Sequence, residues 1–443
     1  MALNSTLVKS TVVAALGGLL FGFDTAVIAG ATSELQDRFS LTPSSLGLTV
    51  AIALWGTVVG ALLAGVPGDR YGRRDSLRVM AVLYLVSALG CAFAANWYAL
   101  VFFRFIGGLA IGGSSVLGPM YIAEIAPAKW RGRLVGFFQF NVVTGILLAY
   151  FSNYIVGLWL RGGASEWRWK LGISAIPAAL FFLMLFQIPR SPRWLARKGR
   201  TEDARSVLEL IGEENVDSEL QAMQAAFLLE QREGKEPLFS ARNKLPLFLA
   251  VSIAMFNQLS GINAILYYLN DIFARAGFSK VSSDLQAVAI GATNLLFTIL
   301  AMSIIDRVGR RTLLLIGSVG TALSLAGVAA IFRTGHHEGL LLWLLIGFIA
   351  AFGFSQGAVI WVYISEVFPT AVRARGQSLG SSTHWIMNAL MSWAFPIVAA
   401  YSKAAPFMFF SAMMLLQFVV VFFFYPETKN IVLEDMEKKL AAV

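Results

Sequence analysis

The feature that most constrains this chain is the spacing of its charged residues. Nine stretches of about 20 to 30 residues contain no Asp, Glu, Lys or Arg, at 39–68, 134–160, 171–189, 245–270, 285–305, 312–332, 339–365, 376–402 and 404–426. Each is long enough to cross a bilayer as a helix. With 57% hydrophobic and 14% charged residues, the chain has too little polar surface for a water-soluble globule. The runs are continuously apolar rather than alternating, which predicts helices and not barrel strands.

Two more apolar windows each contain one charge, Asp24 between Lys9 and Glu34, and Arg104 between Arg78 and Glu124. The second window is roughly twice as long as a bilayer is thick, at about 1.5 Å per helical residue. It therefore has to turn, and 96–98 (Asn-Trp-Tyr) is the expected place. The prediction is an all-α membrane protein with twelve transmembrane helices.

The basic residues predict which loops face the cytoplasm. Lys and Arg cluster after the second, fourth and eighth spans, so these loops, and with an even span count both termini, are expected to be cytoplasmic in a plasma (inner) membrane protein. The same rule explains the net charge of +9 without a nucleic acid partner. The single cysteine, Cys91, excludes an internal disulfide and a cysteine-rich metal site.

An internal repeat divides the spans into two sets of six. YIAEIAPAKWRGR at 121–133 returns as YISEVFPTAVRAR at 363–375, and GDRYGRR at 68–74 returns as IDRVGRR at 305–311 with nearly the same offset. Secondary transporters are commonly built from such repeats, with the substrate site between them, so transport is the leading hypothesis. The predicted organisation is an N-terminal half at 1–189, a cytoplasmic helical linker at 190–245, and a C-terminal half at 246–443 with a short cytoplasmic tail.

Asp24 and Arg104 are the two charges placed deep inside predicted spans. A lone charge there costs at least about 2.5 to 3.5 kcal/mol, so the two are expected to face the interior and each other. They are either a fixed buried ion pair or a carboxylate that alternates between a protonated state and a state paired with Arg104. In the second half, GIN at 261–263 aligns with GFD at 22–24, so Asn263 replaces the acid.

The cytoplasmic repeats place matching acids and bases in both halves. Such carboxylates and guanidinium groups can lock an inner gate, which we favour over ordinary surface pairs worth about 0 to 1 kcal/mol. The predicted gate residues are Asp69, Arg73, Glu124, Arg131, Asp306, Arg310, Glu366 and Arg373.

Polar side chains stranded in apolar spans are the candidates for substrate contacts. Amides suit neutral hydroxyl groups, and an indole face suits the C–H side of a sugar ring. For any single residue, a hydrogen bond between helices is an equally good explanation. The candidates are Gln139, Asn257, Gln258, Asn263, Asn294, Gln356, Trp361, His384, Trp385 and Asn388.

Seven motifs give the whole chain a resemblance to the sugar porter family of the major facilitator superfamily. In family order they are GGLLFGFDTAVIAG (17–30), GDRYGRR, RFIGGLAIGG with YIAEIAP, PRSPRWL (189–195), NQLSGINAILYY (257–268), IDRVGRR and PETK (426–429). Asp24 stands where facilitative glucose carriers have asparagine, as in bacterial proton-coupled xylose and glucose symporters. The resemblance implies a major facilitator fold, proton coupling through Asp24 and Arg104, and sugar contacts from Phe21, Gln139, Gln258, Asn263, Asn294, Trp361, Trp385 and Asn388.

Four residues depart from the family pattern. Asn257 replaces the first of two glutamines, Ala358 replaces a proline before Trp361, and His384 replaces an amide. These three touch the sugar site or its gate, and Arg190, in place of an acid, touches the cytoplasmic network. Because His384 can change charge near neutral pH, it either gives sugar binding a pH dependence or acts as a neutral hydrogen-bond partner.

The expected function is proton-coupled monosaccharide symport by alternating access. A facilitative uniporter is the nearest alternative, and a transporter-like sugar sensor is a more distant one. A membrane enzyme is disfavoured because the sequence offers no convincing nucleophile and base, and no metal-ligand spacing. The expected partners are a monosaccharide, the bilayer and a proton, with no other cofactor, no metal and a functional monomer.

Overall fold

The chain folds into helices that form two compact units. The computed structural model describes residues 4–127, 129–160, 163–232, 237–369 and 372–429, and within these ranges it contains no strand. Unit 1 consists of Met1–Val27, Ile52–Ser152 and Gly163–Gly234, and unit 2 of Ile28–Ala51, Asn153–Gly162 and Lys235–Val443. The division at 189/190 and 245/246 drawn from the repeat stays a prediction, and the expected tail at 430–443 lies outside the described residues.

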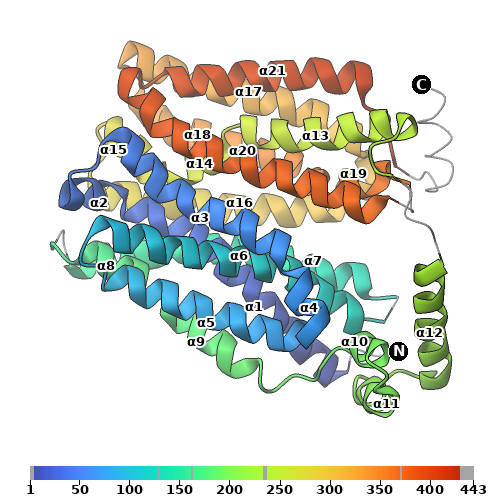
Figure 1. Cartoon of the computed structure of the whole chain (residues 1–443). Helices are drawn as coiled ribbons and strands as arrows, with labels where there is room; N and C mark the ends of the chain where they lie inside the picture. The colour runs from blue at the N-terminus through green and yellow to red at the C-terminus, as the bar shows by residue number, and fades with distance from the viewer. Residues whose placement is uncertain (1–3, 128, 161–162, 233–236, 370–371, 430–443) are drawn as a thin grey trace. The chain divides into compact units, whose positions relative to one another are not determined.

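Unit 1 is built around α1, α5 and α6, which pack against one another (Figure 1). Its elements are α1 (Ser5–Val27), the second part of α3 (Pro43–Leu63), α4 (Gly65–Tyr71), α5 (Arg73–Ala92), α6 (Trp97–Ile125), the first part of α7 (Arg131–Leu160), α8 (Glu166–Gly172), α9 (Ala175–Met184), α10 (Pro192–Arg197), α11 (Thr201–Leu210) and α12 (Val216–Arg232). The last two correspond to helices expected in the polar linker.

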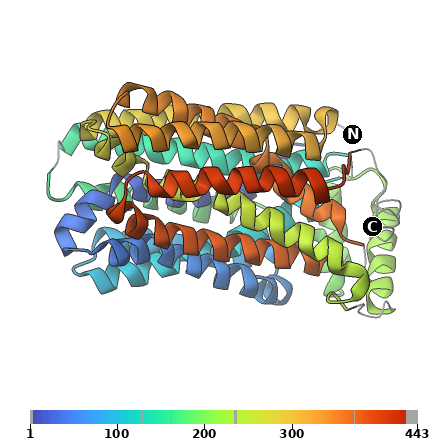
Figure 2. The same ribbon diagram turned by 90° about the horizontal axis from the view of Figure 1, so that it is seen from above.

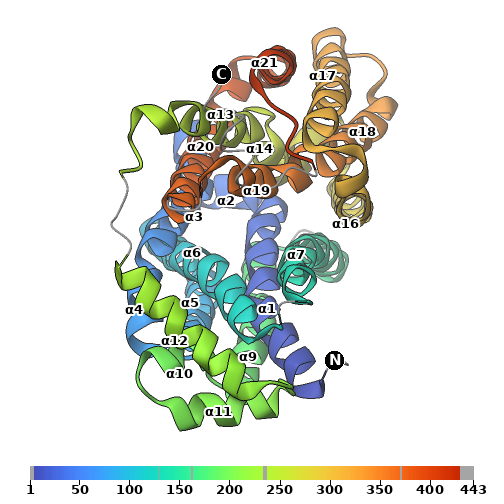
Figure 3. The same cartoon turned by 90° about the vertical axis from the view of Figure 1, so that its right-hand side faces the viewer.

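Unit 2 contains the longest helices of the C-terminal part. In Figure 2, α17, α18 and α21 run alongside one another, and Figure 3 shows α16, α17 and α18 nearly end-on and packed together. Its elements are η1 (Ile28–Gly30), α2 (Thr32–Phe39), the start of α3, the end of α7, η2 (Ala241–Asn243), α13 (Lys244–Leu259), α14 (Ile262–Tyr267), α15 (Leu269–Arg275), α16 (Lys280–Val308), α17 (Arg310–Thr334), η3 (Glu338–Leu340), α18 (Leu341–Phe354), α19 (Gln356–Val367), α20 (Arg373–Tyr401) and α21 (Ala405–Phe424).

Ten helical segments in the described part of the chain are long and apolar enough to cross a membrane. The sixth and eleventh predicted spans are not among these ten, and each has a physical reason. The sixth is divided into α8 and α9, where the Ser174 hydroxyl donates to the Leu171 carbonyl oxygen at 2.7 Å. The eleventh, α20, is 29 residues long but carries Arg373, Arg375 and a polar run at 381–384. The total agrees with the predicted twelve.

The turn expected at 96–98 is present. Helix α5 ends at Ala92 and α6 begins at Trp97. The Asn96 side chain caps α6 by accepting a hydrogen bond from the Ala99 backbone N–H at 2.9 Å. An asparagine in this position satisfies one of the unpaired donors at a helix start, which explains why the long apolar window breaks at this point.

The sequence repeat is reproduced as a repeat of hydrogen bonds. Arg73 donates to the Gly68 carbonyl oxygen at 2.8 Å, and Arg310 donates to the equivalent Ile305 oxygen at 3.3 Å. Tyr121 donates to the Pro189 oxygen at 2.8 Å, as Tyr363 does to the Pro426 oxygen at 3.2 Å. Arg73 and Arg310 each come directly after a glycine with positive φ, +94° at Gly72 and +103° at Gly309. Residues other than glycine rarely adopt this conformation.

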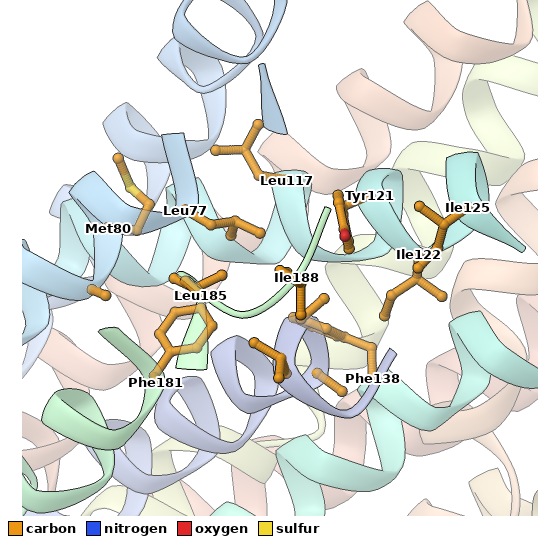
Figure 4. Packing of buried hydrophobic residues seen from close by; sticks show 14 of the residues in the cluster. Leu77, Met80, Leu117, Tyr121, Ile122, Ile125, Phe138, Phe181, Leu185 and Ile188 are labelled. Carbon is orange, nitrogen blue, oxygen red and sulfur yellow. The ribbon is translucent and has the colours of Figure 1, made fainter. Parts of the chain in front are cut away.

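Apolar side chains from several helices fill the interior of unit 1. Figure 4 shows members of this cluster, including Leu77 and Met80 of α5, Leu117 and Tyr121 of α6, and Phe181 of α9. In a bilayer the surrounding lipid is as apolar as these side chains, so helix association depends on close packing rather than on removal of apolar surface from water. Close approach of helix backbones is therefore a large part of what holds such a unit together.

Candidate substrate and proton sites

A break in the seventh span sets up the polar cluster of unit 2. Helix α13 ends at Leu259 and α14 begins at Ile262. Gly261 has φ +81°, and a Cβ there would lie 2.2 Å from the Phe410 ring. The Ser260 hydroxyl donates to the Asn257 carbonyl oxygen at 2.6 Å, which satisfies one backbone group at the break. Interrupted helices of this kind commonly carry substrate groups in transporters.

Three amides around the break form a chain of hydrogen bonds. Asn263 Nδ2 donates to Gln258 Oε1 at 3.1 Å, and Gln258 Nε2 donates to Asn257 Oδ1 at 3.0 Å. Gln258 Nε2 also lies 3.3 Å from both ring nitrogens of His384. Gln258 is thus buried and engaged by three side chains. The structure brings together four of the predicted substrate residues, Asn257, Gln258, Asn263 and His384.

Two tryptophans flank the His384 ring. The centroid of Trp361 lies 5.0 Å from that of His384, and the centroid of Trp385 lies 5.1 Å away on an edge-on approach. Trp385 is buried, whereas Trp361 is 38% exposed. An exposed indole beside a buried amide chain is the combination that binds an apolar ring face and hydroxyl groups together.

The eleventh span connects to a residue that sequence reasoning missed. Asn388 Nδ2 lies 3.5 Å from the Tyr267 hydroxyl, and the Ser392 hydroxyl donates to Asn388 Oδ1 at 3.2 Å. Tyr267 is buried and follows directly in the NAILYY run after the break. Its position soon after the amides in the sequence was the available signal.

The other predicted contacts are spread over α1, α7, α16 and α19. Asn294 is buried on α16, and Gln356 Nε2 lies 3.1 Å from the Met414 sulfur. Phe21 on α1 and Gln139 on α7 are half-buried and belong to unit 1. Their roles as sugar contacts stay predictions.

Asp24 and Arg104 are close enough for their charges to interact, as expected. Arg104 is buried in α6 and Asp24 lies one turn before the end of α1. Gly107 lies beside this pair and makes room for Ser87, because a Cβ at that position would lie 2.5 Å from the Ser87 hydroxyl; it would touch Asp24 Oδ1 only at an ordinary contact distance of 3.9 Å. The role of this pair in proton coupling stays a prediction.

In the described part of the chain, five of the eight predicted gate residues form ion pairs within their own unit. In unit 1, Arg73 bonds to Asp69 at 2.9 Å and to Glu124 at 3.0 Å. In unit 2, Arg310 bonds to Glu366 at 2.9 Å. Of the remaining gate residues, Arg131 donates to the Ala126 carbonyl oxygen at 3.5 Å and Arg373 to the Phe368 oxygen at 3.3 Å, while the Asp306 side chain lies outside the described part. Gating by these residues stays a prediction.

Replacing Trp361 by alanine is expected to weaken sugar binding by about 1 to 3 kcal/mol. This is the usual cost of losing an aromatic contact to a ligand or of leaving a buried hydrogen-bonding group without its partner. The melting temperature should change little, because this side chain is 38% exposed. Isothermal titration with a panel of pentoses and hexoses measures the effect. Trp343→Ala on α18, where the indole is 67% exposed, is the matched control. An unchanged isotherm for Trp361→Ala would remove this residue from the site.

Gln258→Ala is expected to weaken sugar binding by a comparable amount, about 1 to 3 kcal/mol, and, unlike Trp361→Ala, also to destabilise the protein. The substitution leaves Asn263 Nδ2 and Asn257 Oδ1 without their buried partner, which carries its own penalty. Melting curves recorded beside the isotherms separate the two effects. Wild-type affinity in this variant would contradict the assignment.

His384 is expected to act as a neutral hydrogen-bond partner. Gln258 Nε2 is a donor, and only an unprotonated ring nitrogen can accept from it. His384→Gln should therefore bind sugar with the same pH dependence as the wild type between about pH 5 and 8. Binding isotherms at several pH values test this. A pH dependence present in the wild type and lost in His384→Gln would instead assign His384 a titrating role.

Comparison with known proteins identifies the family of this chain. A family model described as "Sugar (and other) transporter" matches residues 10–440. The D-xylose-proton symporter of Escherichia coli (strain K12) is 35% identical over 474 residues, covering 98% of this chain and 96% of that protein. The arabinose-proton symporter of Bacillus subtilis (strain 168) is 37% identical over 431 residues, covering 96% and 93%.

Solved structures of a xylose transporter have the same fold as this chain. The inward open conformation of the xylose transporter XylE from E. coli matches with a TM-score of 0.87 and 33% identity, covering 98% of this chain and 99% of that one. The chain therefore belongs to the sugar transporter family. The predicted twelve-helix major facilitator fold and the resemblance to sugar porters are confirmed, and the class of the protein is a transporter rather than an enzyme.

Proposed function

We propose that this protein cotransports a monosaccharide with a proton by alternating access. The observation that carries the proposal is the Asp24 carboxylate, which lies in the last turn of α1, inside a membrane span, and within reach of the Arg104 charge. A carboxylate in that environment is a functional group by default, because a merely structural charge would be costly to keep there. The similar proteins named as D-xylose-proton and arabinose-proton symporters support the same conclusion.

The polar cluster of unit 2 supports a neutral sugar as the cargo. Amide donors and acceptors at Asn257, Gln258 and Asn263 match hydroxyl groups, and Trp361 provides a face for ring C–H groups. In this assignment Phe21, Gln139, Asn294, Trp385 and Asn388 complete the sugar contacts. The family relatives named for xylose and arabinose make pentoses the first sugars to test.

The proposal extends to topology and gating. The protein is a multi-pass component of the plasma (inner) membrane with both termini in the cytoplasm, and the positively charged loops support this orientation. It works as a monomer, and the proton is its only coupling ion. The networks around Arg73 and Arg310 lie on the cytoplasmic side and close the inner gate, as part of a two-state switch.

Reconstituted protein in liposomes tests the function directly. With a pH gradient and an inside-negative potential, labelled D-xylose or D-glucose should accumulate above its external concentration, and a protonophore should abolish the accumulation. Sugar addition should also acidify the liposome interior. Equilibration without accumulation, unaffected by the protonophore, would favour the uniporter instead, and absence of any sugar flux would contradict transport of these sugars.

A further inference from the structure

Unit 2 contains a cavity that is separate from its polar cluster. It has a volume of about 270 Å³, and none of the amides or tryptophans of the cluster lines it. The cavity is partly open, since Ala274, Arg275 and Lys403 at its edge are exposed. Its lining comes from α2, α3, α15, α17, α20 and α21, and consists of Gln36, Leu46, Tyr268, Asp271, Ile272, Ala274, Arg275, Phe332, Phe395, Pro396, Ala399, Lys403 and Phe407.

The inner wall of this cavity is aromatic. Tyr268 and Phe395 are stacked with ring centroids 5.2 Å apart, and Phe332 and Phe407 are stacked at 5.4 Å. Phe395 meets Phe407 edge-on at 6.1 Å, which joins the two pairs into one surface. The Tyr268 hydroxyl donates to the Ser392 carbonyl oxygen at 3.0 Å, so this ring is held in place. Such a wall suits one planar ring of a ligand.

The rim of the cavity is charged, with a positive excess. Arg275 Nη1 donates to the Ala399 carbonyl oxygen at 2.8 Å, and Lys403 Nζ donates to the Arg275 carbonyl oxygen at 3.2 Å. Each bond occupies one of several N–H groups on its cation. Asp271 is the single acid in the lining, and it interacts with Thr32 and Arg275. Lys403 therefore has no carboxylate of its own among the lining residues.

We propose that this cavity binds an amphipathic monoanion, with an aromatic ring against the Tyr268–Phe395 wall and a carboxylate- or sulfonate-type group at Lys403 and Arg275. Two cations against one acid leave one positive charge for a single anionic group to neutralise. A charged acceptor makes stronger hydrogen bonds to Lys and Arg than a hydroxyl does, which favours the anion over a neutral sugar. The volume limits the ligand to about one ring with a short substituent.

The test is a titration of the purified full-length protein with benzenesulfonate at fixed ionic strength, followed by thermal shift and calorimetry. Benzenesulfonate is the probe because it stays ionised and does not carry protons. It should raise the melting temperature in a saturable way. Methanesulfonate has the charge without the ring, and benzenesulfonamide has the ring without the charge, so each should bind at least tenfold more weakly. Equal binding of either would overturn the proposal.

Substitutions at the rim give effects of opposite sign. Lys403→Gln should weaken benzenesulfonate binding about tenfold, while Lys403→Arg should retain it. Asp271→Asn removes the competing negative charge with an isosteric group and should tighten binding several-fold. Arg333→Gln, which neutralises a base next to Phe332 but outside the lining, is the matched control and should bind as the wild type does. Affinity that is the same in Lys403→Gln and Asp271→Asn would overturn the proposal.

The neutral-sugar alternative is tested in the same preparation. The Trp361→Ala variant weakens sugar binding at the polar cluster of unit 2. A second sugar site would then remain visible as a thermal shift at high D-xylose. Loss of that residual shift on adding Lys403→Gln, or competition between D-xylose and benzenesulfonate, would show that the cavity takes sugar and would contradict the anion assignment. Independent responses to the two ligands are the expected result.

Discussion

Asp24→Asn is expected to bind sugar and to lose the ability to concentrate it. Carrying one proton inward with each sugar supplies roughly 2.3 kcal/mol per 100 mV of membrane potential, enough for roughly fifty-fold accumulation. Asparagine keeps the size and polarity of Asp24 but cannot carry a proton. In liposomes with an imposed potential and pH gradient, the variant should equilibrate sugar at most, and its sugar flux should move no protons.

The physical basis is a balance of two opposing effects on one carboxylate. Burial disfavours the charged form of an acid, while the nearby Arg104 guanidinium favours it. If Asp24 carries the proton as proposed, a small change in its separation from Arg104 during transport would switch which form is preferred. Proton uptake and release would then be linked to the conformational cycle rather than to sugar contact alone.

The control for this experiment is Asp203→Asn on α11, which removes an exposed carboxylate of the polar linker and should leave accumulation unchanged. Protonophore-sensitive accumulation by Asp24→Asn would mean that another group carries the proton. Loss of sugar binding itself in Asp24→Asn would instead make the carboxylate part of the sugar site, and that outcome also contradicts a role confined to proton coupling.

Much of this fold was predictable because the bilayer imposes simple rules. Charge-free stretches located the spans, and the excess length of one window located the turn at Asn96. The repeat predicted that Arg73 and Arg310 would occupy equivalent positions, and their bonds to Glu124 and Glu366 follow that pattern. These features depend on composition and on local helix ends, which a single sequence records directly.

The details of the polar cluster were less accessible, because they depend on a helix break and on side-chain orientation. The sequence indicated Gln258 as a ligand group, but not that Asn257, Asn263 and His384 would already engage it. Tyr267 was missed because its closeness to the amides in the sequence was the only signal, and an aromatic residue in an apolar span gives no indication of a polar contact until the partner of its hydroxyl, Asn388, is known. Side-chain networks across distant spans have no periodicity in the sequence.

The departure at Arg190 has a physical account that the structure supplies. In unit 2, Glu427 accepts hydrogen bonds from the backbone N–H groups of Arg310 and Arg311 at 2.9 and 3.1 Å, at the start of α17. In unit 1, the equivalent position is Arg190, and it pairs at 2.8 Å with Asp75, an acid in the first turn of α5. Both arrangements place a carboxylate at the positive end of a helix. The sequence showed the missing acid but not its replacement.

The packing of α3 against α6 leads to the second large prediction, which depends on contacts that the sequence alone does not reveal. Gly108 and Gly112 lie one turn apart on α6, facing Ala53 and Thr57 of α3. A Cβ at Gly108 would lie 2.0 Å from the Ala53 carbonyl oxygen, and one at Gly112 would lie 2.1 Å from the Thr57 oxygen. Both obstacles are backbone atoms, which cannot rotate away as a side chain can. Small residues four apart are the usual means by which membrane helices approach this closely.

The double variant Gly108→Ala with Gly112→Ala is therefore expected to lose most of its folded yield. Each added methyl group forces α3 and α6 apart, and overpacking of this kind costs about 1 to 3 kcal/mol per site or more. Alanine has the higher helix propensity, by about 1 kcal/mol, so local preference works in the opposite direction and cannot cause the loss. Gly132→Ala at the start of α7, where a Cβ meets nothing within 4 Å, is the matched control and should be neutral or stabilising. Size-exclusion profiles and melting temperatures in detergent measure both variants, and a double variant that melts with the wild type would mean that α3 and α6 are not held at this distance by their glycines.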